Sequence, residues 1–348
     1  MNILDTTFRT LAALCVSSAA FAPGQVSATE LFVSSAGTSR IMQFDAGPAT
    51  GNPGSFFANA GLETPYGLAI GPDGNLYVAN DRSGSDNIKV YNGETGSPLA
   101  GAPQGTGTFA TAGVSAPRDI AFRPNGNLLV SVETSAGVGV VREYDGTTGA
   151  LIGPFISTAN LDRPQGIAFG PTGDFFVASD ASDNNRDKIN RYDANGMTVD
   201  LSFAGFNDAN LIDPRDIAFG PDGNLYVVSA GLELILRYDG VTGAALPAPG
   251  ETGSIFVNDV SSLNGIEGIA FGLGGDLFVS DTGNNRIRRY DGATGLPLNG
   301  ALQNYASGNG LGGPTYLTFR VPEPATLALL GLGLAGIGYQ RRKQIKAA

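Results

Sequence analysis

The sequence predicts an all-β fold, a closed six-bladed β-propeller built from four-stranded blades. A unit of about 50 residues recurs along the chain, and this is the period of a four-stranded propeller blade. The 51 glycines and 20 prolines separate short apolar runs by turns. Between residues 30 and 320 there is no long amphipathic helical period, and 42% of all residues are hydrophobic, which is enough to fill a core.

The clearest copy of the unit runs from Pro214 to Gly243. Its apolar stretches Ile217–Phe219 and Leu225–Val228 flank the sequence Gly-Pro-Asp-Gly at 220–223, and a third strand is expected at Leu234–Tyr238. The four-residue connector predicts a hairpin turn, because proline presets φ, aspartate bonds the backbone two residues on, and glycine adopts positive φ. The strands are apolar almost without alternation, so both faces of each sheet are expected to be buried.

We call the first strand of each repeat unit its opening strand, and the number of opening strands predicts the number of blades. They start at Pro65, Pro117, Pro164, Pro214, Ile266 and Pro314. The first unit, from Glu30, lacks an opening strand, and the last unit consists of nothing else. Pairing Thr315–Phe319 with Leu31–Ser34 completes one blade and closes a ring of six without an unpaired edge. An open solenoid would leave both ends unpaired.

The stretch GIEGIAFGLGGDLFVSDTGNNRIRRYD at 265–291 is an almost intact repeat signature. On these residues the chain from about 30 to 320 resembles the NHL family and related six-bladed propellers. The resemblance implies the fold. It implies no single activity, because propellers carry many unrelated functions.

The N-terminal segment has the pattern of a secretory leader. Arg9 precedes an apolar run from Leu11 to Ala22, and Val26 and Ala28 have the spacing of a cleavage site. We therefore expect a signal peptide at 1–28, the propeller at 29–320 and a separate segment at 321–348. The alternative for the first segment is a buried N-terminal helix.

The C-terminal segment has three parts. Val321, Pro322, Glu323 and Pro324 precede an apolar stretch at 325–339, and Arg341, Arg342 and Lys343 follow it. This order resembles a PEP-CTERM sorting signal, which implies that an exosortase processes the chain after the secretion machinery has exported it. The apolar stretch would form a transmembrane helix of roughly 22 Å whose basic end stays in the cytoplasm. The alternative is a plain membrane anchor without processing.

The resemblance also implies a location. The chain would cross the inner membrane of a Gram-negative bacterium, be held transiently by the C-terminal helix, and reach the cell surface or the extracellular matrix. The composition excludes several other functions. A net charge of −11 argues against nucleic-acid binding. Histidine is absent and the single cysteine, Cys15, lies in the expected leader, so the usual histidine-based catalysis and zinc sites are excluded.

The residue after each opening position varies while its neighbours repeat. Opening strands line the channel of a propeller, so these residues are expected to ring one mouth of it and to contact a ligand. The six candidate ligand-binding residues are Tyr66, Arg118, Gln165, Arg215, Glu267 and Thr315. The alternative is a solvated channel lining in which Arg118 with Asp119, and Arg215 with Asp216, brace adjacent blades.

Metal binding and catalysis have few candidate residues. Gluconolactonase-like propellers hold a divalent metal with Glu, Asn and Asp from the opening strands, and Glu267 fits such a position, whereas Arg118 and Arg215 would oppose a metal. Streptogramin-lyase-like relatives need histidine. No cofactor is expected except Ca²⁺, for which the loop at 180–187 offers carboxylate oxygens; Asx turns are the alternative use of that loop. Its candidate ligands are Asp180, Asp183 and Asp187.

Two functions follow from these features. The first is a non-catalytic binding or scaffold protein at the cell surface or in the exopolysaccharide matrix, with a glycan or a protein as its ligand. No catalytic residue is assigned in that case. The alternative is a secreted, metal-dependent, lactonase-like hydrolase or lyase that uses Glu267.

Overall fold

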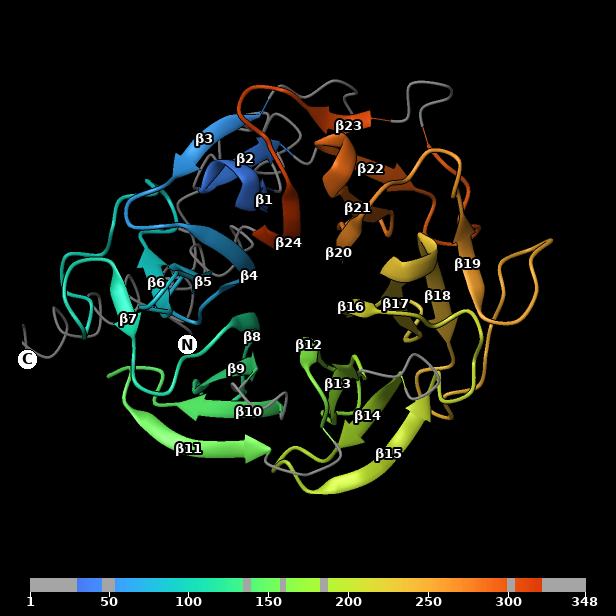
Figure 1. Cartoon of the computed structure of the whole chain (residues 1–348), viewed down its shortest axis with the longest axis horizontal. Coiled ribbons are helices and arrows are strands. Elements are labelled where there is room, and N and C mark those ends of the chain that lie inside the picture. Colours follow the sequence, from blue (N-terminus) through green and yellow to red (C-terminus); the bar gives the residue numbers. More distant parts are fainter. Residues whose placement is uncertain are drawn as a thin grey trace, which may run out of the picture.

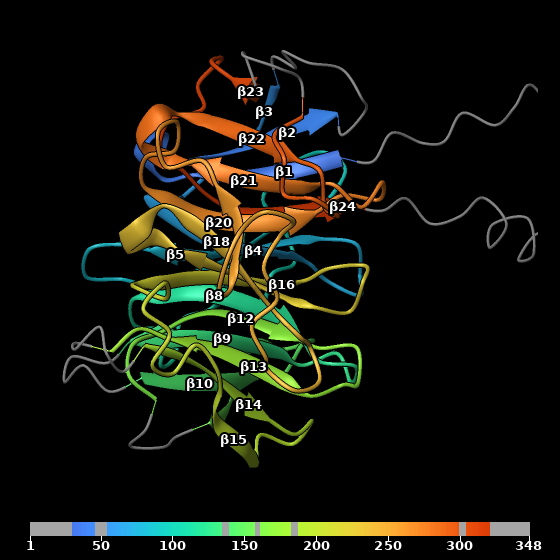
Figure 2. The same cartoon turned by 90° about the vertical axis from the view of Figure 1, so that its right-hand side faces the viewer.

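A computed structural model describes residues 30–45, 54–133, 139–156, 161–181, 187–298 and 304–320. These residues form six four-stranded antiparallel sheets arranged as blades around a ring (Figure 1). The predicted six-bladed propeller is therefore confirmed. Seen from the side, the blades stack along the ring and their connecting loops project from its two flat faces (Figure 2).

Each blade begins with its innermost strand, at the centre of the ring, and continues outward. Blade 1 is β24 (Pro314–Arg320), β1 (Glu30–Ser35), β2 (Arg40–Asp45) and β3 (Ser55–Ala58); blade 2 is β4 (Thr64–Ile70), β5 (Leu76–Asp81), β6 (Asn87–Tyr91) and β7 (Thr108–Ala110); blade 3 is β8 (Pro117–Phe122), β9 (Leu128–Glu133), β10 (Gly139–Tyr144) and β11 (Leu151–Ile156). Blade 4 is β12 (Pro164–Phe169), β13 (Phe175–Ser179), β14 (Lys188–Tyr192) and β15 (Thr198–Ala204); blade 5 is β16 (Pro214–Phe219), β17 (Leu225–Ser229), β18 (Leu234–Tyr238) and β19 (Ile255–Asn258); blade 6 is β20 (Ile266–Phe271), β21 (Leu277–Asp281), β22 (Arg286–Tyr290) and β23 (Asn304–Ser307).

The two ends of the propeller close the ring as predicted. Strand β24 pairs antiparallel with β1, and Leu31 lies opposite Phe319. Figure 1 shows the last strand beside the first one in the same blade. The closing blade therefore combines the two ends of the propeller, which removes the unpaired edge.

The core consists of apolar layers between neighbouring blades. Tyr226 and Phe256, both of blade 5, pack edge-to-face with their ring centroids 4.9 Å apart. Tyr226 also packs edge-to-face on Phe271 of blade 6, at 4.7 Å. The strands β5, β13, β17 and β21 are buried along almost their whole length. Both faces of the sheets are buried, which explains why these strands show no polar alternation.

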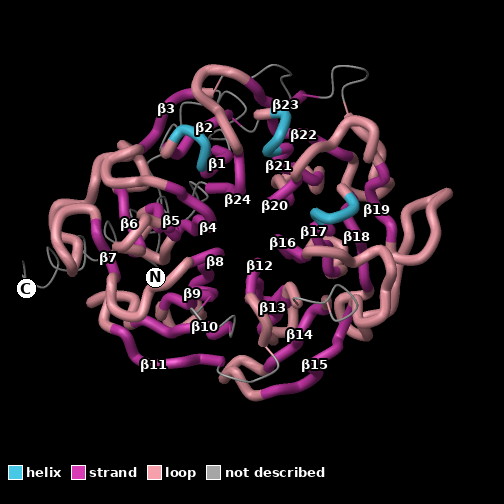
Figure 3. Tube along the Cα trace, viewed as in Figure 1, coloured by secondary structure: helices cyan, strands magenta, loops and turns pink. Residues whose placement is uncertain are grey.

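The turns follow the chemistry that the sequence predicts. In blade 5 the N–H of Asn224 donates to Oδ1 of Asp222 at 3.1 Å, and Gly223 has φ +78°. Short 3₁₀ turns follow β1, β17 and β21 at Ala36–Thr38, Ala230–Leu232 and Thr282–Asn284 (Figure 3).

The expected leader at 1–28 and the sorting segment at 321–348 lie outside the described residues. Within the described ranges, no helix has the length and apolar character needed to cross a membrane.

Candidate functional site at the mouth of the central channel

The six opening strands surround the centre of the ring (Figure 1). All six break register with the neighbouring strand after the opening position, as between Pro214 and Ile217. The bulge frees backbone N–H groups at the third position. Serine hydroxyls of the second strands accept some of these hydrogen bonds. The backbone N–H of Asp119 donates to Ser131 Oγ at 2.9 Å, and the backbone N–H of Gly268 donates to Ser280 Oγ at 2.7 Å.

The third residue of the opening strand alternates around the ring between glycine and a larger side chain. In blade order from blade 2 these residues are Gly67, Asp119, Gly166, Asp216, Gly268 and Tyr316. The glycines are required by close approach: a Cβ on Gly67 would lie 2.4 Å from Asp119 Oδ1, and a Cβ on Gly268 would lie 2.4 Å from the carbonyl oxygen of Thr315. Three small residues thus make room for three large ones at the axis.

The two central aspartates brace adjacent blades. Asp119 accepts the N–H of Ile120 at 2.8 Å and, across the blade boundary, that of Ile167 at 2.9 Å. Asp216 likewise accepts the N–H of Ile269 in blade 6 at 2.9 Å. Burial raises the pKa of Asp119 to about 7, and burial followed by the charge of Asp119 raises the pKa of Asp216. Among the described residues no ion pair joins Arg118 to Asp119 or Arg215 to Asp216, so the aspartates brace the blades through backbone N–H groups and not through the neighbouring arginines.

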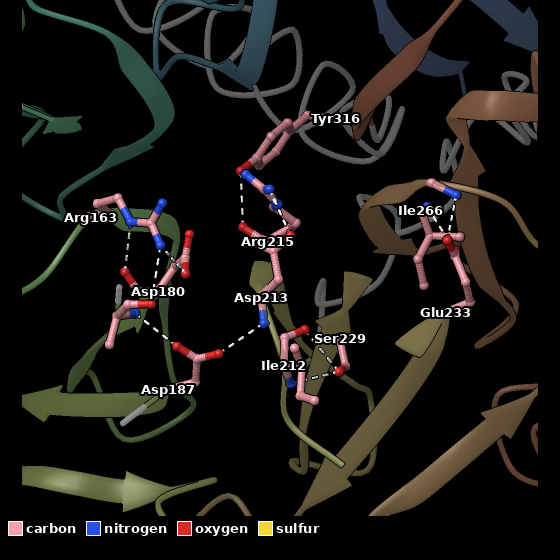
Figure 4. A network of polar contacts seen from close by, with 12 residues as sticks. Arg163, Asp180, Asp187, Ile212, Asp213, Arg215, Ser229, Glu233, Ile266 and Tyr316 are labelled. Carbon is pink, nitrogen blue, oxygen red and sulfur yellow. Dashed lines mark hydrogen bonds and ion pairs between the residues drawn. The ribbon is translucent and has the colours of Figure 1, made fainter. Parts of the chain in front are cut away.

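Tyr316 crosses the channel. Its hydroxyl donates to the carbonyl oxygen of Arg215 at 3.0 Å, linking blade 1 to blade 5 (Figure 4). The side chain is buried, and its pKa is raised by burial first and then by the charge of Asp119. The sequence predicts Asp119 and Asp216 only as partners of the arginines beside them and does not predict the role of Tyr316, although the alternation with glycine is readable in the repeats.

The structure separates the six sequence-predicted ligand residues into two groups. Gln165 and Thr315 are each 3% exposed. Thr315 Oγ1 bonds to the carbonyl oxygen of Pro65 at 3.0 Å and to Ser34 Oγ at 2.9 Å, so it joins blades 1 and 2. These two side chains belong to the packed interior, which leaves four residues at the mouth.

We refer to Tyr66, Arg118, Arg215 and Glu267 as the mouth residues. The Arg118 guanidinium carbon lies 4.7 Å from the centre of the Tyr66 ring, and Arg118 Nη1 lies 4.0 Å from Asp81 Oδ2. Within the part of the chain that the structure describes, the buried Nε atoms of Arg118 and Arg215 have no hydrogen-bond partner. Burial raises the pKa of Glu267, while the charges of Arg215 and Arg118 oppose that shift.

An ionic network surrounds Arg215 (Figure 4). Arg215 Nη2 donates to Asp213 Oδ2 at 2.7 Å, and Arg163 Nη2 donates to Asp180 Oδ1 at 2.8 Å. Asp213 has φ +55° and Arg163 has φ +26°, an uncommon backbone conformation for residues other than glycine. The residue before the opening strand also has positive φ at Ala116, Gly265 and Gly313, at +37°, +65° and +54°, so this conformation belongs to the repeat and is not particular to Arg215.

The expected calcium ligands are engaged by the protein. Asp180 pairs with Arg163, and the two oxygens of Asp187 accept the N–H groups of Ala181 at 2.8 Å and of Asp213 at 2.9 Å. Asp183 lies outside the described residues. Among the residues that are described, no three histidine, cysteine, aspartate or glutamate side chains are grouped as metal ligands. Glu267 lies among arginines, so its surroundings do not fit a divalent cation.

The geometry and the sorting segment define the class of protein: a six-bladed propeller that is exported. Residues 320–343 match the PEP-CTERM protein-sorting motif, which marks the chain for export and exosortase processing in Gram-negative bacteria. Residues 15–231, more than half of the chain, match the family described as "Lactonase, 7-bladed beta-propeller". The chain belongs to this propeller family, although its described residues form six blades. The ring also fits the NHL resemblance in its broad outline.

Solved structures share the fold at low identity. A chain of the nidogen/laminin complex aligns with a TM-score of 0.66 at 16% identity, covering 85% of this chain and 100% of that one. A protein of unknown function from Bacteroides caccae aligns at 0.53 and 14% identity, covering 84% and 99%. The calcium-binding protein regucalcin from Agrobacterium tumefaciens aligns at 0.51 and 17%, covering 72% and 76%. No curated protein matches the chain.

Proposed function

We propose that this protein is a non-catalytic binding protein of the cell surface or extracellular matrix, and that its ligand contacts the mouth residues. In this proposal a leader at 1–28 exports the chain, the propeller at 29–320 binds, and the segment at 321–348 anchors the protein transiently before exosortase releases it. The observation that carries the proposal is the pair of partly exposed guanidinium groups at the channel mouth, since the side chains of Arg118 and Arg215 are 20% and 27% exposed.

The mouth residues favour a ligand with an acidic group. Arg118 and Arg215 can each donate to a carboxylate through the exposed part of the guanidinium group, because each already has only one ion pair, with Asp81 and Asp213 respectively, among the described residues. Glu267 can accept from a hydroxyl or an ammonium group. A glycan with acidic groups and an acidic protein loop both meet these requirements.

The proposal is tested by binding of the purified protein to an array of bacterial polysaccharides and to matrix extracts. Arg118→Gln with Arg215→Gln should reduce binding by about ten-fold or more, since each loses a charge-assisted contact. Arg237→Gln is the matched control, because Arg237 lies on the third strand of blade 5, where it bonds to the carbonyl oxygens of Leu246 and Pro247 and stacks on the Phe256 ring at 4.7 Å. Equal binding by the double variant and by the control would reject the mouth as the binding site.

The family match favours a second candidate, the lactonase-like hydrolase or lyase using Glu267, although the arginines around Glu267 do not fit the divalent metal expected for it. The buried, partly neutralised carboxyl of Glu267 has a raised pKa, as a general acid or base requires. Turnover of a lactone panel, with and without added divalent metals, separates the two functions. Turnover that Glu267→Gln abolishes would replace the binding proposal by the enzymatic one.

A further inference from the structure

A polar cleft of about 550 Å³ lies on blade 2, away from the mouth residues. Amide and hydroxyl side chains line much of it, among them Asn87, Gln104, Thr108 and Thr111. Lys89, in the middle of β6, also lines the cleft and is only 9% exposed. Its Nζ donates to Thr108 Oγ1 at 2.9 Å.

No carboxylate among the described residues forms an ion pair with Lys89. A buried ammonium without a counter-charge is unusual, because desolvation opposes the charged form. Burial accordingly lowers the pKa of Lys89, and the nearby charge of Arg82 lowers it further. The cleft therefore contains a positive charge that the protein itself does not neutralise.

The repeats show how the chain neutralises such a cation elsewhere. Arg288 occupies the same position in blade 6, two residues before the buried tyrosine of the third strand, and is 3% exposed. It forms an ion pair with Asp259, the residue directly after β19 of the preceding blade, and Asp259 Oδ2 also accepts the Tyr290 hydroxyl at 3.1 Å.

In blade 2 that carboxylate is missing. Ala58 lies opposite Ile41 as Val257 lies opposite Ile235, so Ala60 takes the place of Asp259, and the hydroxyl of Tyr91 donates to the carbonyl oxygen of Ala60 at 2.7 Å. The next residue, Gly61, lies so close that an added Cβ would be 2.9 Å from Lys89 Nζ. The loop therefore supplies no counter-charge to Lys89, and its glycine backbone lies beside the ammonium group.

The acidic groups near the cleft are engaged. Asp86, which lines it, accepts the N–H of Arg82 at 2.8 Å and that of Ala116 at 2.8 Å. Glu63 pairs with Arg82 at 3.3 Å. Their charges disfavour a polyanion such as a nucleic acid, so the cleft suits a ligand with a single negative charge and several hydroxyl groups.

We propose that the blade 2 cleft binds a single uronic acid unit flanked by neutral sugars in a polysaccharide, with the sugar carboxylate on Lys89 Nζ and the hydroxyl groups on the surrounding amide and hydroxyl side chains. The cleft volume lies in the range of small-molecule sites. The ligand carboxylate supplies the counter-charge that Asp259 supplies in blade 6. None of the mouth residues lines this cleft, although Asp86, which does, lies beside Asp81, the ion-pair partner of Arg118.

Isothermal titration of the full-length protein in detergent with D-glucuronate, D-glucose and acetate tests the proposal. Glucuronate should bind about ten-fold or more tightly than either glucose, which lacks the charge, or acetate, which lacks the hydroxyl groups. Binding of glucose or of acetate with the same affinity as glucuronate would overturn the assignment.

Two variants locate the binding. Lys89→Met should remove it, and its melting temperature should stay at or above that of the wild type, because the substitution removes a buried unpaired charge. Lys188→Met, on β14 of blade 4 and outside the cleft, is the matched control and should bind normally. Unchanged binding by Lys89→Met would overturn the proposal.

Ala60→Asp provides a second test that does not remove Lys89. It restores the carboxylate found in blade 6, so it should neutralise Lys89 internally and weaken glucuronate binding while the fold is kept. Binding that survives Ala60→Asp, or that is lost in the Arg118→Gln and Arg215→Gln variant but kept in Ala60→Asp, would reject the blade 2 cleft. In the second case the acidic sugar would belong to the mouth site instead.

Discussion

At the scale of single residues, the centre of the ring combines buried charge with close backbone contact. Asp119 and Asp216 each give both oxygens to backbone N–H groups and are 7% and 4% exposed. The hydrogen bonds favour the charged form and burial opposes it, and burial prevails, since both pKa values are raised.

This balance predicts that stability falls as the pH rises. The unfolded chain has an aspartate pKa of about 3.9, and the folded pKa of Asp119 is about 7, so between these values the folded state binds more protons than the unfolded state. The free energy of unfolding therefore decreases from pH 5 to pH 8, and the raised pKa values of Asp180 and Glu267 act in the same direction. Urea unfolding at several pH values measures this change in the free energy of unfolding.

Asp119→Asn serves as the control for the pH effect. It loses one acceptor, which lowers stability at every pH, but it should flatten the pH dependence because the titrating group is gone. A urea midpoint that rises between pH 5 and pH 8 in the wild type would contradict the assignment.

The inner glycines give a second prediction. Gly67→Ala places a Cβ 2.5 Å from the Asp119 Cα, so blades 2 and 3 must move apart. We expect a loss of about 1–3 kcal/mol in the free energy of unfolding. Gly101→Ala is the matched control, because a Cβ there meets no atom within 4 Å. Equal denaturation midpoints for the two variants would show that the inner strands can relax.

At the scale of elements, strand β24 has three structural roles. It pairs with β1 to close blade 1, it supplies Phe319 to the packing on Phe278 of blade 6 at 5.1 Å, and it carries Tyr316 across the channel. No other opening strand is so far in sequence from the strand it pairs with.

Deleting residues 314–320 should expose the edge of β1 and open the layer between blades 6 and 1. The truncated protein is expected to aggregate, because an exposed edge strand pairs with other chains. Size-exclusion chromatography and thermal melting measure this outcome. A monomeric truncated protein with an unchanged melting temperature would mean that closure by β24 contributes nothing to the ring.

At the scale of the whole molecule, a compact propeller is joined to a sorting segment. The propeller has its own closed core, and the family match places the sorting motif at 320–343, immediately after β24. The fold and the sorting signal are thus encoded in separate stretches of the chain.

Replacing Pro322, Glu323 and Pro324 by alanine should block processing but not export. Proline disfavours helix in the residue before it, so the wild-type motif is expected to be extended and open to a protease. In an exosortase host the wild type should lose its basic tail, while the triple variant stays at full length in the membrane fraction. Mass spectrometry of both fractions measures the result, and a host without exosortase is the control. Wild-type protein that keeps residues 325–348 would favour the plain anchor.

The sequence by itself determined the fold and the address. Each repeat carries its own turn chemistry and apolar strands, so six units at regular spacing predict six blades, and the missing strand of the first unit predicts closure by Thr315–Phe319. These features are local, or they follow from counting, so no tertiary contact is needed to read them.

The tertiary structure alone decided which polar residues are available to a ligand. It buried Gln165 and Thr315, turned Asp187 toward two backbone N–H groups, and brought Tyr316 across the axis to Arg215. Such outcomes depend on contacts between residues that are far apart in the chain. Equivalent positions of the repeat can therefore have different roles. Thr315 is buried and joins two blades, whereas Arg215 is partly exposed, because each position contacts a different neighbouring blade.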